Sequence, residues 1–303
     1  MDKIKNKILE LVEEGMTSKD LITNLRINEE ELKQKISLLQ KEGHNITKQF
    51  FYNGTQKYIL QKSIPDNITH ILASPKNGEF KAIAASDYHI GNKKQNLDYL
   101  ERIYEFAIKN DIHIIFNCGD VIEGMKNKNN YNLNYHEQIE TLLEYHPFDE
   151  NIISFIVLGN HDADLIRSTG LDLNTIINEN RSDLISLGYN PTKIGINNNE
   201  ILMCHTANQI RNIPAKLKLT GHGHRYHFGI HNGEPSLYLP TASNNLYDDF
   251  PPGFIYINFE LINGIFTKGT FYFYTFGKKN IIRTCYDKYN YESSYPKQKT
   301  LYK

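Results

Sequence analysis

The amino-acid sequence predicts an α/β protein in which a β-sandwich is flanked by helices and preceded by a small helical domain. Short apolar runs and longer amphipathic runs alternate from Phe80 onwards: 81–86, 97–109, 112–119, 135–145 and 152–159. Such alternation is typical of a layered α/β sheet. Later strand-like runs have few helices between them: 193–197, 200–205, 216–221, 226–231, 236–240, 253–261 and 264–276. They predict a second, mostly antiparallel sheet packed on the first.

The N-terminal part of the chain predicts three helices followed by a β-hairpin. Apolar residues recur at helical spacing over three segments, 3–14, 18–25 and 29–43. Thr17 or Ser18 can cap the second helix, and Asn28 can cap the third. Asn53-Gly54 joins two β-like runs and is a strong hairpin signal. This order resembles a winged helix-turn-helix domain over residues 2–62, so the first domain is placed at 1–63.

Three further segments complete the division of the chain. Residues 64–79 contain prolines and Gly78 with little periodicity, which predicts a linker. The main domain is placed at 80–275, and a basic, tyrosine-rich tail at 276–303. The tail interleaves cations with tyrosines: Lys278, Lys279, Arg283, Lys288, Lys297 and Lys299 with Tyr286, Tyr289, Tyr291 and Tyr295.

The composition excludes several classes of protein. The chain has 303 residues, of which 40% are hydrophobic and 23% charged, as in a globular protein with a core. No apolar run approaches the roughly 18 residues of a membrane span, and the charged N-terminus is no signal peptide. The net charge of −1 argues against a generally basic nucleic-acid binder. Cys118, Cys204 and Cys285 are too widely spaced for a disulfide framework. We therefore expect a cytoplasmic protein without membrane contact.

Five short polar motifs each follow an apolar run: Asp87-Tyr88-His89, Gly119-Asp120, Gly159-Asn160-His161-Asp162, His205 and Gly221-His222-Gly223-His224. The carboxyl ends of strands in α/β sheets converge on one edge, where ligands bind. Motifs that are distant in sequence can therefore share one pocket. Their carboxylates, amide and imidazoles form a mixed oxygen and nitrogen donor set, which suits transition-metal cations better than Ca²⁺ or Mg²⁺.

This ordered set of motifs resembles the calcineurin-like metallophosphoesterase superfamily, over roughly residues 80–275. The resemblance implies a metallophosphoesterase-type β-sandwich with helices on both outer sides. It also implies hydrolysis of phosphoric esters with two divalent metal ions. Mn²⁺ is the first choice, with Fe, Zn, Co or Ni as alternatives.

The resemblance also implies a role for each residue of the motifs. One metal would be held by Asp87, His89, Asp120 and His224, and the second by Asp120, Asn160, His205 and His222. His161 would face the phosphate and protonate the leaving oxygen, and Asp162 would orient His161.

A few neighbouring residues allow two interpretations each. His205 can also be a half-buried, hydrogen-bonded histidine. Glu123 can support the site or be a solvated loop acid. Arg225 can contact a phosphate or pair with a surface acid. His136 and His146 flank a helical stretch; either can reach the substrate, but both are expected at the surface.

The motifs do not fix the substrate. A nuclease acting on DNA or RNA is favoured, because the winged-helix-like domain offers four candidate nucleic-acid contacts, Lys33, Lys35, Lys48 and Lys57. Its charge is only +2, however, and Glu29, Glu30 and Glu31 begin the third helix. The tail suits single strands or a protein partner. The alternative is a small-molecule or nucleotide phosphoesterase whose N-terminal domain regulates it or forms a homodimer. A non-enzymatic regulator is disfavoured, because every motif is intact.

Overall fold

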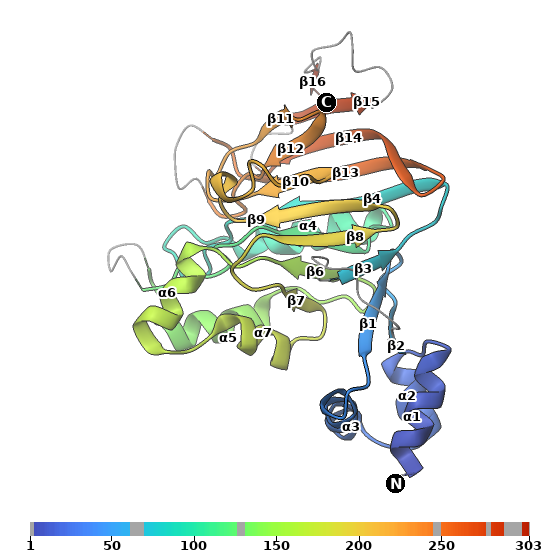
Figure 1. The fold of residues 1–303 in the computed structure, drawn as a ribbon. Helices are drawn as coiled ribbons and strands as arrows, with labels where there is room; N and C mark the ends of the chain where they lie inside the picture. Colours follow the sequence, from blue (N-terminus) through green and yellow to red (C-terminus); the bar gives the residue numbers. More distant parts are fainter. Residues whose placement is uncertain are drawn as a thin grey trace.

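The computed structural model describes residues 3–60, 70–125, 131–244, 250–276, 280–287 and 299–302. Two eight-stranded sheets pack face to face, and the N-terminal helices lie at one end of the sandwich (Figure 1). Among the described residues, no helix is long and apolar enough to cross a membrane.

Sheet 1 contains the strands that alternate with helices. Its order is β16 (Lys299–Tyr302), β15 (Asn280–Asp287), β14 (Ile265–Thr275), β13 (Gly253–Ile262), β4 (Gly78–Ala85), β5 (Ile114–Asn117), β6 (Ile153–Ile156) and β7 (Leu184–Ser186). Strands β4 to β7 run parallel, and their alternation with helices confirms the predicted layered α/β sheet. The prediction that 253–261 and 264–276 join the second sheet is wrong, because β13 pairs antiparallel with β4. The apolar alternation of β13 identifies a strand with one core face, but it does not identify the partner strand.

Sheet 2 is mixed and not mostly antiparallel. Its order is β11 (His227–His231), β12 (Glu234–Tyr238), β10 (Leu217–Thr220), β9 (Asn199–Cys204), β8 (Thr192–Ile196), β3 (His70–Ala73), β1 (Ile46–Phe51) and β2 (Gln56–Leu60). Strands β9, β10 and β12 run parallel, whereas β8 and β11 are antiparallel to their neighbours β9 and β12. The two sheets bury a common apolar core between them.

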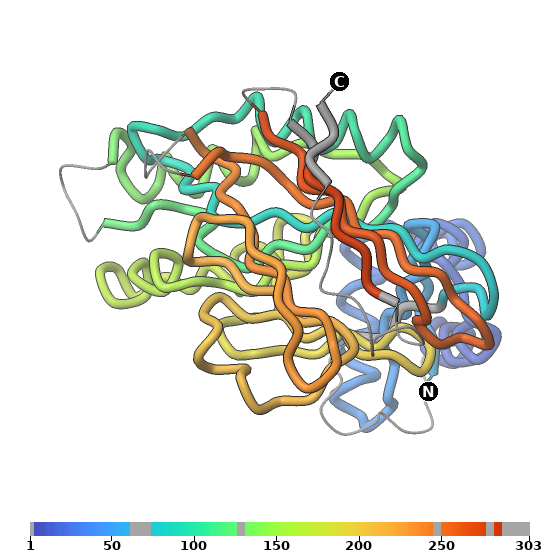
Figure 2. The backbone as a smooth tube through the Cα atoms, turned by 90° about the horizontal axis from the view of Figure 1, so that it is seen from above, coloured from blue at the N-terminus to red at the C-terminus, as the bar shows by residue number. Residues whose placement is uncertain are grey.

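Four helices cover the outer face of sheet 1: α4 (Leu97–Lys109), α5 (Tyr135–Tyr145), α6 (Asn160–Thr169) and α7 (Leu173–Asn180). They lie in the connections from β4 to β7, which advance across the sheet in one direction. Right-handed crossovers of this kind place their helices on the same face. Figure 2 shows α4 on the opposite side of the sandwich from the yellow and orange strands of sheet 2. In the described part of the chain, the outer face of sheet 2 carries only the 3₁₀ turn Ala207–Gln209, so helices do not cover both outer sides.

The N-terminal region contains the predicted elements in the predicted order: α1 (Lys3–Glu13), α2 (Ser18–Leu25), α3 (Glu29–Lys41) and the hairpin β1–β2. The Thr17 hydroxyl accepts a hydrogen bond from Asp20 N–H, and the Asn28 side chain accepts one from Glu31 N–H. Ile8 and Leu32 help to form a separate small core. That this region is a winged helix remains a prediction.

The hairpin is also part of the main sandwich. Strand β1 pairs in parallel with β3, which links it to β8. Phe50 lies in the sandwich core, edge-to-face with Phe155 at 5.2 Å between ring centroids. A Cβ on Gly54 would lie 1.9 Å from the carbonyl oxygen of Asn151, so the hairpin tip is packed tightly. The expected linker 64–79 includes β3, and its first six residues lie outside the described ranges.

The expected tail contributes two strands, since β15 pairs with β14 and β16 with β15. Some of its residues lie outside the described part of the chain: Lys278, Lys279, Lys288, Lys297, Tyr289, Tyr291 and Tyr295. The domain bounds remain predictions.

Candidate metal centre

Strands of both sheets place side chains in one polar cluster, which lies at the carboxyl ends of these strands. Asp87 and His89 follow β4, Asp120 follows β5, and Asn160 begins α6 directly after β6. From sheet 2, His205 follows β9, and two further histidines follow β10. The five motifs therefore meet in space, as their position after apolar runs predicted.

The first group of donors is buried. Ligand atoms of four residues lie within 4.8 Å of one another: Asp87, His89, Asp120 and His224. Nε2 of His224 lies 3.2 Å from Nε2 of His89 and 3.2 Å from Oδ1 of Asp87. These are the four residues that the resemblance implied for one metal.

The second group shares Asp120 with the first and adds His205 and His222. Nε2 of His205 lies 3.1 Å from Oδ2 of Asp120, 3.1 Å from Nδ1 of His222 and 3.0 Å from Oδ1 of Asn160. His205 is only 4% exposed, which decides against a merely half-buried histidine. His222 is exposed, so the cluster opens to solvent on the side of this residue.

The second nitrogens of two histidines have fixed partners outside the cluster. Nδ1 of His205 donates a 2.7 Å hydrogen bond to the carbonyl oxygen of Cys118. Nδ1 of His89 donates one of 2.8 Å to Oε2 of Glu123. In each ring Nε2 is then the nitrogen that faces the carboxylates and that can bind a metal ion in place of a proton. This arrangement is typical of metal-binding histidines, and the donor set fits divalent transition-metal ions.

The backbone at the cluster is strained. Among the described residues, ten that are not glycine have a positive φ, and five of these are candidate donors: Asp87, His89, Asp120, His222 and His224. The left-handed region costs such residues about 1–2 kcal/mol each. A Cβ on Gly159 would lie 2.2 Å from Oδ1 of Asp120. Strain of this kind concentrates at functional sites, where it fixes side-chain direction.

The electrostatics of the cluster favour a positive charge. Burial opposes ionisation of Asp120, but the hydrogen bond from His205 and the nearby histidines hold its pKa well below the usual range. Burial acts to lower the pKa of His205, but the Asp120 carboxylate raises it to about 9. The carboxylates therefore stabilise positive charge beside them, which a proton or a bound cation can supply.

His161 is held at the edge of the cluster. Its Nδ1 donates a 2.6 Å hydrogen bond to the carbonyl oxygen of Glu123, and its backbone N–H donates to Oδ1 of Asp120. Asp162 does not orient the His161 ring as expected. Its carboxylate accepts hydrogen bonds from the N–H groups of Gly159 and Ile122, so it ties two loops of the site together. Burial raises the pKa of Asp162 to about 6.

The structure shows how Glu123 and His146 lie, and it gives one neighbour of Arg225. Glu123 is 3% exposed and contacts the site, so it is not a solvated loop acid. The Arg225 guanidinium lies over the Phe250 ring at 5.9 Å, so its neighbour is an aromatic ring. His146 is buried and not at the surface; it packs against the rings of Tyr88 and Tyr104. No spacing rule marked His146, because its burial depends on helix packing.

The four lysines proposed for nucleic acid lie in the N-terminal region, away from the metal centre. Lys33 is exposed and pairs with Glu29 at 3.2 Å, whereas Lys35 is half-buried. Nζ of Lys48 lies 5.5 Å from the centre of the Tyr58 ring, and burial lowers the pKa of Lys48. Nζ of Lys57 lies 5.6 Å from the centre of the Phe51 ring.

Comparisons with known proteins relate this chain to one family. The sequence profile described as calcineurin-like phosphoesterase matches residues 80–251. No curated protein matches the chain. Vacuolar protein sorting 29 from Cryptosporidium parvum is similar in structure at 17% identity and a TM-score of 0.43, over 68% of this chain and 97% of its own. Zn²⁺-bound Vps29 from Entamoeba histolytica is 14% identical, with a TM-score of 0.42, over 69% of this chain and 99% of its own. Nuclease MPE from Pseudomonas putida is 16% identical, with a TM-score of 0.38, over 66% of this chain and 85% of its own.

Proposed function

The chain belongs to the calcineurin-like phosphoesterase family, and from this premise we propose that it hydrolyses phosphodiester bonds of DNA or RNA with two divalent cations, Mn²⁺ being the first choice. One observation carries the proposal: Asp120 belongs to both groups of donors. A carboxylate has two oxygens, so Asp120 can be a ligand of both ions. Paired cations of this kind offset the charge of a phosphodiester and activate water near neutral pH.

The two groups of donors support a division of the ligands between two ions. Asp87, His89, Asp120 and His224 would hold one ion, and Asp120, Asn160, His205 and His222 would hold the other. The exposure of His222 supports substrate entry on the side of the second ion.

His161 acts as the general acid in this proposal. Because Nδ1 donates to the carbonyl oxygen of Glu123, the ring orientation is fixed and Nε2 is left to give a proton to the leaving oxygen. A positioned acid of this type contributes about 10²- to 10⁴-fold to the rate. Asp162 contributes indirectly, by holding Gly159 and Ile122 in place.

The N-terminal region supports a polymeric substrate. Because β1 belongs to sheet 2, α3 is fixed to the same body as the metal centre. A long substrate can thus contact both. We place the main nucleic-acid contact on α3, at Lys33 and Lys35, because the hairpin tip packs against Asn151. Lys48 and Lys57 add positive charge from the hairpin.

Two features favour the second candidate, a small-molecule or nucleotide phosphoesterase. Acidic residues fill the first turn of α3, where they repel a phosphate backbone, and the covered hairpin tip is not free to reach a groove. The N-terminal region would then regulate the enzyme or form a homodimer.

One assay separates the two candidates. The Mn²⁺-loaded protein is incubated with single-stranded DNA, duplex DNA, RNA and bis-p-nitrophenyl phosphate. We expect cleavage of at least one polymer, and a rate for Lys33→Ala/Lys35→Ala that falls on the polymer but not on the small diester. Asp120→Asn should abolish both activities, whereas Asp111→Asn, at an exposed position, should retain them. Cleavage of the small diester alone rejects the nuclease. If the protein cleaves neither the polymers nor the small diester, it is not a phosphodiesterase.

A further inference from the structure

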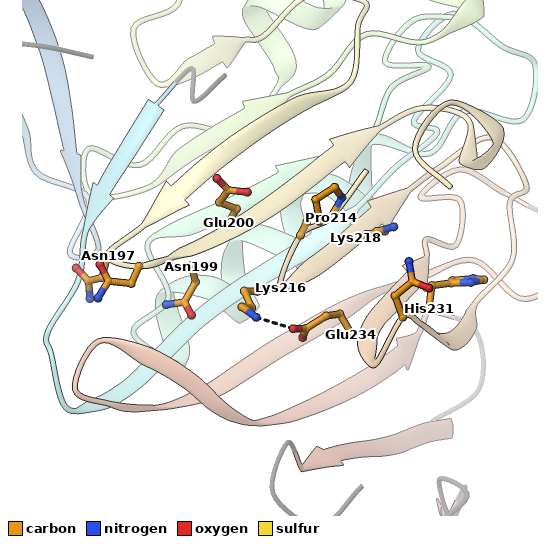
Figure 3. Close-up of a pocket in the computed structure, with 11 residues that line it drawn as sticks. Asn197, Asn199, Glu200, Pro214, Lys216, Lys218, His231 and Glu234 are labelled. Atoms are coloured by element: carbon orange, nitrogen blue, oxygen red, sulfur yellow. Dashed lines mark hydrogen bonds and ion pairs between the residues drawn. The ribbon is translucent and has the colours of Figure 1, made fainter. Parts of the chain in front are cut away.

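The face of sheet 2 that points away from sheet 1 carries a pocket of about 430 Å³ (Figure 3). Three segments line it: the β8–β9 turn at 197–200, the stretch 214–218 that leads into β10, and the β11–β12 turn at 231–234. The volume lies within the range of small-molecule sites. The pocket is separate from the metal centre, because His222 and His224 lie beyond the opposite end of β10.

Lys218 points into this face and is buried. It alternates along β10 with Leu217 and Leu219, which belong to the core between the sheets, so its side chain leaves the sheet on the outer side. The residue is 3% exposed. Figure 3 places Lys218 and His231 at one end of the pocket and Asn197 at the other.

The hydrogen bonds of Lys218 leave its charge without a counter-charge. Nζ donates to the carbonyl oxygens of Ile210 at 3.2 Å and Arg211 at 3.1 Å. An ammonium group has three N–H donors, so these carbonyls use two of them. Within the described ranges, no carboxylate lies at ion-pair distance from Lys218. Burying an uncompensated charge is costly, and burial accordingly lowers the pKa of Lys218.

The acids of the pocket already have cationic partners. Oε1 of Glu234 accepts a 2.6 Å hydrogen bond from Nζ of Lys216, drawn as a dashed line in Figure 3. Glu200 pairs with Lys193 in the same way. The one cation of the pocket lining without an acidic partner in the described chain is therefore Lys218.

A smaller hollow of about 50 Å³ adjoins the pocket and shares Lys218 and His231 with it. Its lining adds the polar side chains of Thr220, Ser236 and Tyr238. Lys218 thus lies between two spaces that a bound molecule can enter.

We propose that this outer-face pocket is a second ligand site, which binds a small molecule bearing a carboxylate or phosphate group with Lys218 as its cationic anchor. The anion supplies the missing counter-charge, and His231, at the same end of the pocket, supplies a further hydrogen bond.

Calorimetric titration of the full-length, Mn²⁺-loaded protein with inorganic phosphate, and separately with acetate, tests this site. Phosphate also binds metal centres, so the titrations are repeated in Asp120→Asn, which lacks the carboxylate common to both donor groups. We expect saturable binding of one equivalent of phosphate or acetate in Asp120→Asn, and the anion that binds identifies the class of ligand. Because the pocket shares no residue with the metal centre, this result does not depend on hydrolytic activity.

Three variants in the same background assign the binding to the pocket. Lys218→Met should lower the affinity for the anion at least tenfold. Lys109→Met removes the same charge at the exposed end of α4 and should leave the affinity for the anion unchanged. Glu234→Gln releases Lys216 from its ion pair and should tighten binding, which keeps the test decisive even if Lys218→Met does not fold. The site is refuted if neither anion binds saturably to Asp120→Asn, or if the affinity for the anion is the same in Lys218→Met and Glu234→Gln as without them.

Discussion

Oε2 of Glu123 accepts a 2.8 Å hydrogen bond from Nδ1 of His89 and lies 3.8 Å from Nδ1 of His161. One buried carboxylate thus contacts a candidate metal ligand and lies beside the candidate acid. The partner of a ligating histidine fixes its tautomer and raises its basicity, and losing such a partner typically costs 10- to 100-fold in metal affinity. Glu123 is therefore a positioning residue in the proposed site.

Glu123→Ala should weaken binding of the ion held by His89 by about 10- to 100-fold. Glu123→Gln keeps an acceptor oxygen for the His89 N–H, so its loss of metal affinity should be smaller. Titration with Mn²⁺, following the free ion by electron paramagnetic resonance, measures this without an activity assay. Glu140→Ala on the exposed side of α5 is the control. An unchanged Mn²⁺ affinity in Glu123→Ala would show that the carboxylate only supports the fold.

The two donor groups predict different metal contents for different variants. His224→Ala removes a donor of the first group only, and His205→Ala removes one of the second only. Each should reduce the content from two ions per chain to about one, whereas Asp120→Asn should affect both ions. Elemental analysis after gel filtration measures the ratio. Loss of both ions from each single histidine variant would mean that the groups form one inseparable site, and a wild type with fewer than two ions would contradict the assignment itself.

His161→Asn separates binding from chemistry. His161 donates to the Glu123 carbonyl and lies beside the donor groups, so its replacement should leave metal content at the wild-type value. Hydrolysis of bis-p-nitrophenyl phosphate should slow at least about 10²-fold, the usual scale for losing a general acid. His136→Asn, an exposed change on α5, should keep full activity. Equal rates for both variants would remove His161 from the mechanism.

The clustering of the candidate metal ligands could be predicted because their signals are local. Asp87, Asp120 and His205 each directly follow an apolar run, and the end of a strand determines where such a residue lies. The caps of α2 and α3 were predictable for the same reason, since Thr17 and Asn28 act within three residues of themselves.

The pairing of strands and the contacts between loops could not be predicted, because they depend on distant parts of the chain. Alternation along β13 gives its core face but not its pairing with β4. Nothing near Gly54 in the sequence indicates that the hairpin tip packs against Asn151. The role of Asp162 was unpredictable for the same reason, since its hydrogen-bond partner Ile122 lies forty residues away in the sequence.

The burial of His146 predicts a pH dependence of stability. Burial and the neighbouring Arg181 charge lower its pKa to about 4, although the Pro147 carbonyl and Asp183 favour the protonated ring. In the unfolded chain a histidine titrates near 6.5. Below pH 6.5 the unfolded state therefore takes up a proton that the folded state does not bind until about pH 4, so acidification favours unfolding. Above pH 6.5 this residue has no effect on the pH dependence.

From pH 7 to pH 5, the difference between these pKa values corresponds to a loss of about 2 kcal/mol in the free energy of unfolding. His146→Phe keeps a ring against Tyr88 and Tyr104 but cannot titrate, so its stability should fall by about 2 kcal/mol less over the same range. Urea unfolding at the two pH values measures both slopes, and His136→Asn at an exposed position should match the wild type. Because only the difference in slope is compared, a constant loss of stability in His146→Phe does not obscure the result. Parallel slopes for the wild type and His146→Phe would mean that His146 titrates normally in the folded protein.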